Sequence, residues 1–135
     1  MANALYDFGR ESFLGGDLDW DADTIELMFI DEDDDVPNLS ADQHHSDRTG
    51  AAIVATSGAF ASKTKAAGVA DAADVTVSTV SGDIFESIDI MQWTGSSATS
   101  ILIANIDTAT GLPCTPNGGD ITVQWDAGAN KIYKL

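Results

Sequence analysis

Positive charge is what this sequence has least of. Only 6 of its 135 residues are Lys or Arg, against 22 Asp and Glu, so the formal net charge is -16. Proteins hold nucleic-acid phosphates with clustered cations, and anionic membrane surfaces attract basic segments. The composition therefore argues against nucleic acid and against membranes as partners. An acidic surface of this kind favours solubility and resists non-specific association.

Cysteine and long apolar segments are also scarce. Cys114 is the single cysteine, so no intrachain disulfide can form. No apolar run approaches the roughly 20 residues that a membrane-spanning helix needs. The first ten residues lack the basic start and apolar centre of a signal peptide. We expect a soluble protein made in a cytoplasm.

The apolar residues that are present follow a β pattern. In residues 24–30, Ile25, Leu27 and Phe29 share one face of an alternating strand. Residues 59–73 are rich in alanine, but their glycines and β-branched residues favour extended segments with turns. Further strand candidates are residues 51–56, 75–79, 84–93, 100–106, 121–125 and 131–135, the last two forming a closing hairpin. The sequence predicts an all-β fold: a single antiparallel β-sandwich or jelly-roll-like domain over residues 17–135.

Residues 1–16 predict an N-terminal arm or short helix. Asn3 could cap the helix and Gly15-Gly16 could end it, whereas Gly9 weakens its interior. Apolar side chains gather here, and they either pack on the domain itself or contact a neighbouring subunit. The candidate interface residues of this segment are Leu5, Tyr6, Phe8, Phe13 and Leu14.

A second candidate interface lies in the loop of residues 108–119. Its two prolines and three glycines exclude regular structure and favour a rigid excursion from the domain. Leu112, Pro113 and Pro116 are the candidate contact residues of this loop.

The acidic runs raise the question of a cation site. Asp17, Asp19, Asp21 and Asp23 alternate, but an EF-hand loop starting at Asp17 would need glycine at Ala22 and glutamate at Met28. A looser cation site there or at residues 31–35 is one interpretation. Solvated carboxylates that cap turn amides are the other, and we favour it.

No catalytic arrangement is visible. Both histidines, His44 and His45, lie in one loop without a neighbouring cysteine, and there is no G-x-S-x-G or phosphate-binding motif. We therefore predict no catalytic residue, no cofactor, no metal and no enzymatic activity. Trp20, Trp93 and Trp125 could line a carbohydrate platform, but we expect them in the core or in a subunit interface.

Several phrases, taken together, resemble small virion structural proteins of tailed bacteriophages. The likeness spans nearly the whole chain and carries no catalytic signature. The phrases are Ala4-Leu5-Tyr6-Asp7 with Gly9-Arg10 and Phe13-Leu14, Asp17-Leu18-Asp19-Trp20-Asp21, Val54-Ala55-Thr56-Ser57-Gly58, Gly68-Val69-Ala70-Asp71-Ala72, Ile106-Asp107-Thr108-Ala109-Thr110-Gly111-Leu112-Pro113, and residues 117–135.

The resemblance implies a capsid cement, or decoration, protein. Such a protein would self-associate, as a homotrimer, and would bind the major capsid protein on the capsid surface of the virion. A tail, adaptor or fibre-base component is one alternative, and a carbohydrate- or cation-binding module for host recognition is another.

Overall fold

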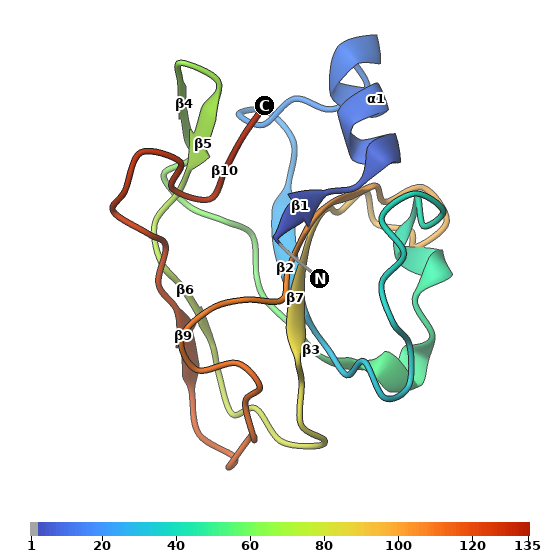
Figure 1. Ribbon diagram of the computed structural model, residues 1–135, viewed down its shortest axis with the longest axis vertical. Helices are drawn as coiled ribbons and strands as arrows, with labels where there is room; N and C mark the ends of the chain where they lie inside the picture. The colour runs from blue at the N-terminus through green and yellow to red at the C-terminus, as the bar shows by residue number, and fades with distance from the viewer. Residues whose placement is uncertain (1–2) are drawn as a thin grey trace.

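A five-stranded antiparallel sheet forms the centre of the fold in the computed structural model, which describes residues 3–135 (Figure 1). Its strand order is β1-β8-β7-β2-β3. The longest pairing joins β2 to β7 over six residue pairs, from Ile25 opposite Gln92 to Ile30 opposite Ser87. The strands are β1 (Ala4–Leu5), β2 (Ile25–Ile30), β3 (Ile53–Thr56), β7 (Ser87–Gln92) and β8 (Leu102–Ile106).

Two smaller sheets face one side of the central sheet (Figure 1). One has the order β10-β5-β4, and the other pairs β6 with β9. The predicted all-β fold with a short N-terminal helix is confirmed, and the layers are sandwich-like. The strands of the smaller sheets are β4 (Thr64–Ala66), β5 (Val69–Asp71), β6 (Val75–Val77), β9 (Ile121–Val123) and β10 (Tyr133–Lys134).

The predicted closing hairpin is wrong. Strand β9 pairs with β6, and strand β10 pairs with β5, so the last two strands belong to different sheets. Alternation identified both strands correctly, but it carries no information about partners far away in the chain. Residues 59–73 do form the extended hairpin of β4 and β5 rather than a helix.

The strands of the central sheet carry apolar side chains on both faces, and both faces are buried. On one face Ile25, Leu27 and Phe29 join the main core against the smaller sheets, as predicted. Phe29 stacks on Phe85 there with ring centroids 4.2 Å apart. On the other face Met28 and other side chains of the sheet form a second core. Both faces of the sheet therefore need a cover.

Residues 31–52 cover the second face, although they are strongly acidic. They carry two short 3-10 helices, η1 (His45–Asp47) and η2 (Gly50–Ala52), and lie on the side of the sheet opposite β6 and β9 (Figure 1). We expected a solvated loop at residues 31–35, but Asp31 is only 6 % exposed. Ala52 is fully buried in the second core, with Leu39 and Ile53 packed beside it.

The N-terminal segment is part of the sheet and also of a helix. Strand β1 pairs with β8, and helix α1 (Asp7–Gly15) follows with Tyr6 at its N-cap position. Asn3 therefore does not cap the helix; its side chain instead accepts hydrogen bonds from the amides of Asp107 and Thr108. Gly16 ends the helix in the left-handed conformation, at φ 83°. Residues 1 and 2 of the predicted arm lie outside the described residues.

Gly9 allows this helix to approach the sheet closely. A Cβ atom at position 9 would lie 2.8 Å from the carbonyl oxygen of Leu102 and 3.0 Å from that of Ile103. Both oxygens belong to the backbone of strand β8, which cannot rotate away as a flexible side chain can. The glycine that weakens the helix as a sequence signal is therefore the residue that lets the helix pack.

We expect Gly9→Ala to lower the free energy of unfolding by about 1–3 kcal/mol, because overpacking outweighs the gain of roughly 1 kcal/mol in helix propensity. Urea unfolding measured by far-UV circular dichroism tests this. Gly15→Ala in the same helix is the matched control, since its Cβ would meet only an Asp17 side-chain oxygen at 3.4 Å. Equal stability of the two variants would contradict the packing argument.

Candidate functional site

A buried ion pair and the tyrosine beside it join the N-terminal segment, the central sheet and residues 31–52, called here the acidic loop. Arg48 Nε donates to Asp89 Oδ2 at 2.9 Å, and neither side chain is exposed. Tyr6 donates its hydroxyl to Asp89 Oδ1 at 2.6 Å and accepts from Arg48 Nη2 at 3.2 Å. The three residues form a closed triangle in the interior of the protein.

Further polar groups surround this triangle. Asp42 accepts a hydrogen bond from Arg48 Nη2, and Asp35 Oδ1 lies 3.2 Å from Arg48 Nη1. Asn105 Nδ2 donates to Asp89 Oδ1 at 2.9 Å. Both residues 35 and 42 lie in the acidic loop, whereas Asp89 and Asn105 lie on β7 and β8. Arg48 therefore binds the loop to the sheet through three carboxylates.

Burial controls the electrostatics of the cluster. Burial raises the pKa of Asp89, while the Arg48 guanidinium and the hydrogen bonds donated to the carboxylate oppose that shift. Burial also raises the pKa of Tyr6, and the neighbouring Asp89 raises it further. Because the Arg48 side chain is inaccessible and its partners lie within the chain, the cluster acts as a structural cross-link.

The sequence analysis did not identify this cluster. One signal was available: Asp89 interrupts the apolar side chains of Ile88, Ile90 and Met91 in strand β7. A carboxylate at such a position is buried only with partners, so it implies a cation or donors elsewhere. Which of the six basic residues supplies that cation could not be read from the sequence, because Arg48 lies 41 positions away.

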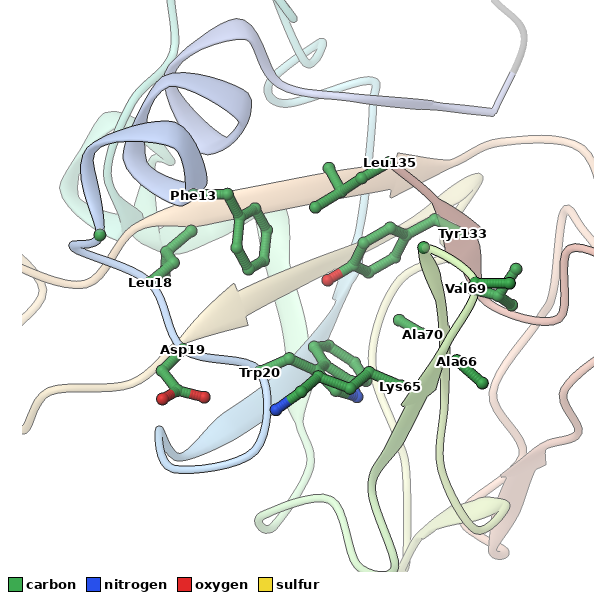
Figure 2. A pocket seen from close by; sticks show the side chains of 13 residues that line it. Phe13, Leu18, Asp19, Trp20, Lys65, Ala66, Val69, Ala70, Tyr133 and Leu135 are labelled. Atoms are coloured by element: carbon green, nitrogen blue, oxygen red, sulfur yellow. The ribbon is translucent and has the colours of Figure 1, made fainter.

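The candidate binding site is an apolar pocket of about 490 Å³ at the end of the molecule where helix α1 and the C-terminal strand meet (Figures 1 and 2). Three aromatic rings form its walls. Trp20 and Tyr133 pack edge to face with centroids 5.4 Å apart, and Phe13 lies 6.2 Å from Tyr133. The other side chains labelled around it are Leu18, Asp19, Lys65, Ala66, Val69, Ala70 and Leu135.

Local structure explains why these residues meet. The end of helix α1 supplies Phe13, and the chain reverses at Gly16 to bring Leu18 and Trp20 back beside it. Strand β10 pairs with β5, which places Tyr133 opposite Ala70. Trp20 is fixed by a hydrogen bond from its Nε1 to the Asp71 carbonyl oxygen at 3.3 Å.

The predicted interface residues of the N-terminal segment have different environments. Leu5 and Tyr6 are buried in the domain itself, at 7 % and 0 % exposure, and are not accessible to a partner. Phe8 and Phe13 are half-buried against the main core. Leu14 is 90 % exposed and does not line the pocket. Of the five residues, Phe13 is therefore the one that lines the pocket.

The predicted interface residues of the second loop lie elsewhere. Leu112 and Pro116 are half-buried, and Pro113 is exposed after a cis peptide bond. The loop is anchored where Cys114 pairs with Phe85, at the end of the molecule away from α1 and the C-terminus (Figure 1). The start of the loop touches the N-terminal segment, because the Thr108 amide donates to Asn3 Oδ1 at 2.9 Å, but Leu112, Pro113 and Pro116 do not line the aromatic pocket.

The first acidic run serves as a turn. Asp19 Oδ1 accepts hydrogen bonds from the amides of Asp21 and Ala22, which lower the pKa of Asp19. Asp23 Oδ2 accepts from the Asp19 amide at 2.8 Å and from Gln92 Nε2 at 2.8 Å. These contacts agree with the interpretation that the carboxylates cap turn amides.

The second acidic run brings carboxylates close together. Oxygens of Asp31, Asp33 and Glu86 lie within 4.8 Å of one another, and Asp31, Asp34 and Asp83 form a similar group. Asp31 Oδ1 already accepts from the Asp33 amide at 2.9 Å. The grouping provides oxygens that a hard cation prefers, but the same carboxylates also serve the loop's own amides.

The histidines and the remaining tryptophans pack within the fold. His44 lies against Phe8 and His45 against Trp93, with ring centroids 5.1 and 5.4 Å apart. Burial lowers the pKa of His45. Trp93 packs on the second core, and Trp125 packs half-buried on the main core, with its Nε1 donating to Ala73.

No protein-family model matches the chain, and no curated protein is significantly similar to it in sequence. Within residues 3–135, no helix has the length and apolarity that a membrane span requires.

We expect Arg48→Met to lower the free energy of unfolding by about 3–5 kcal/mol, because it leaves Asp89 buried without its cation. Arg10→Met is the matched control, since Arg10 forms an exposed pair with Asp7 and should change stability by less than about 1 kcal/mol. Adding Asp89→Asn to Arg48→Met should recover part of the loss. Urea unfolding of all three variants measures these changes. Equal stability of Arg48→Met and Arg10→Met would contradict the role of Arg48 as a cross-link.

Proposed function

We propose that this chain is a non-enzymatic structural protein of a tailed-phage virion, namely a capsid cement protein that binds the major capsid protein and bridges its subunits. The sequence resemblance suggests the class. The observation that carries the proposal is the aromatic pocket at one end of the molecule, whose lining includes Leu135, a large apolar residue that is 59 % exposed. Large apolar side chains exposed around a hollow favour protein–protein contact.

The charge distribution supports a protein partner. Most cations are already paired with carboxylates: Arg10 with Asp7, Lys65 with Asp21, Lys131 with Asp71, and Arg48 in the interior. The remaining acidic groups therefore dominate the surface. Such a surface repels phosphates, and it favours partners that are neutral or basic where they touch.

The construction of the domain suits repeated docking. A central sheet covered on both faces and cross-linked by Arg48 makes a rigid body that loses little entropy on binding. Many equivalent copies on a shell can each contribute a modest contact, because linked contacts add through effective concentration. Self-association as a homotrimer belongs to the proposal, and sedimentation equilibrium of the purified chain measures it.

The copy number of the chain in purified virions tests the proposal. We expect a fixed ratio to the major capsid protein that is close to one or another large fraction, measured by quantitative mass spectrometry of gradient-purified particles. A count of a few to a few dozen copies per particle would instead indicate a tail, adaptor or fibre-base component. Absence from the particles would contradict the structural role altogether.

One observation favours the alternative of a cation-binding module, namely the carboxylate groups around Asp31. If cement is the function and these carboxylates only cap turns, millimolar Ca²⁺ should leave the melting temperature unchanged relative to NaCl of equal ionic strength. A Ca²⁺-specific rise that Asp31→Asn abolishes would favour the cation-binding module, because a ligand that binds only the native state raises its stability.

A further inference from the structure

We propose that the aromatic pocket binds a leucine-like side chain presented by a partner segment that carries basic residues on either side. The pocket is formed by Phe13, Leu18, Trp20, Tyr133 and their neighbours (Figure 2). The inference rests on the proposed function in one respect: the proposed function makes the partner a subunit of the capsid shell. The chemistry of the occupant follows from the pocket itself.

The Tyr133 hydroxyl lies in the pocket without a hydrogen-bond partner from the described residues of the protein. The residue is 8 % exposed, and burial raises its pKa. Figure 2 shows the hydroxyl directed into the space between Phe13 and Trp20. Tyr6, the other tyrosine, donates its hydroxyl to Asp89. Among residues 3–135, no hydrogen bond to the Tyr133 hydroxyl is present.

A ligand that enters the pocket would cover this hydroxyl, and it would have to supply a hydrogen-bond partner to avoid the cost of leaving the hydroxyl unpaired. A main-chain carbonyl of an extended segment could accept the Tyr133 proton while a neighbouring side chain enters the pocket. The walls are almost entirely hydrocarbon or aromatic, so the side chain that enters is apolar and bulky. Such an anchor in a concave aromatic site is typical of the residues that contribute most to binding.

Charge around the pocket specifies the flanking residues. Asp19 lies on its rim, and Asp17, Asp21 and Asp23 belong to the same turn. Two of the nearby lysines are already engaged: Lys65 pairs with Asp21, and Lys63 donates to the Asp23 carbonyl oxygen. A third, Lys134, lies beside Gly68 of the pocket. The net charge of the whole chain, -16, attracts a segment with lysine or arginine beside the anchor and disfavours a second copy of this acidic chain at the pocket.

Three capped pentapeptides test the inference on the full chain by ¹H–¹⁵N NMR titration. Their central residues are lysine–leucine–lysine, lysine–glycine–lysine and glutamate–leucine–glutamate. We expect the first to shift the Trp20 indole and the amides of Gly16 and Val69. We expect the other two to bind at least about tenfold more weakly, because one lacks the anchor and the other lacks the charge complement.

Two variants identify the site. Tyr133→Phe keeps the ring and should weaken the lysine–leucine–lysine peptide about three- to tenfold. Ala70→Leu narrows the pocket and should abolish the shifts; if this buried substitution unfolds the chain, Tyr133→Phe alone decides. Val36→Ala, at a side chain 63 % exposed outside the pocket, is the control and should bind like the wild type.

The outcomes separate this inference from the proposed function. No shift with any peptide, equal binding of all three, or an unaffected Tyr133→Phe would overturn the pocket as a site for a basic, apolar-anchored segment. Peptide binding as expected, with the chain absent from virions, would leave the pocket inference standing and remove the shell as its partner.

Discussion

Both faces of the central sheet are apolar, and the rest of the structure follows from the need to cover each of them. Two small sheets cover one face with ordinary hydrocarbon packing. The other face is covered by residues 31–52, which have few apolar side chains to contribute. Arg48 compensates for that shortage, because it binds carboxylates of the loop and of the sheet at once. A buried ion network of this kind specifies one position of the loop more than it adds net stability.

The aromatic pocket results from where the two ends of the described chain lie. Strand β1 and helix α1 sit at one edge of the sheet, and strand β10 returns to β5 at the same end of the molecule (Figure 1). Phe13 and Tyr133 therefore come to line one pocket, whose walls are mostly apolar.

The sequence predicted the all-β class and most strands, because alternation as in Ile25, Leu27 and Phe29 directly reflects a buried face. It did not predict which strands pair at the C-terminus, since pairing depends on residues distant in the chain. Its grouping of Leu5 and Tyr6 with exposed Leu14 also reflects a limit: composition shows apolarity but not which side is covered. The pocket could not be predicted, because Phe13, Trp20 and Tyr133 meet only in three dimensions.

The pairing of β1 with β8 has a consequence for the order of folding. Ala4 lies opposite Asn105, and the Tyr6 hydroxyl bonds Asp89 across 83 positions. During synthesis β1 leaves the ribosome long before its strand partner β8 is made. The apolar residues of the N-terminal segment must therefore remain uncovered until β8 follows. A topology with so many distant contacts is expected to fold slowly for its size and to need protection from premature association.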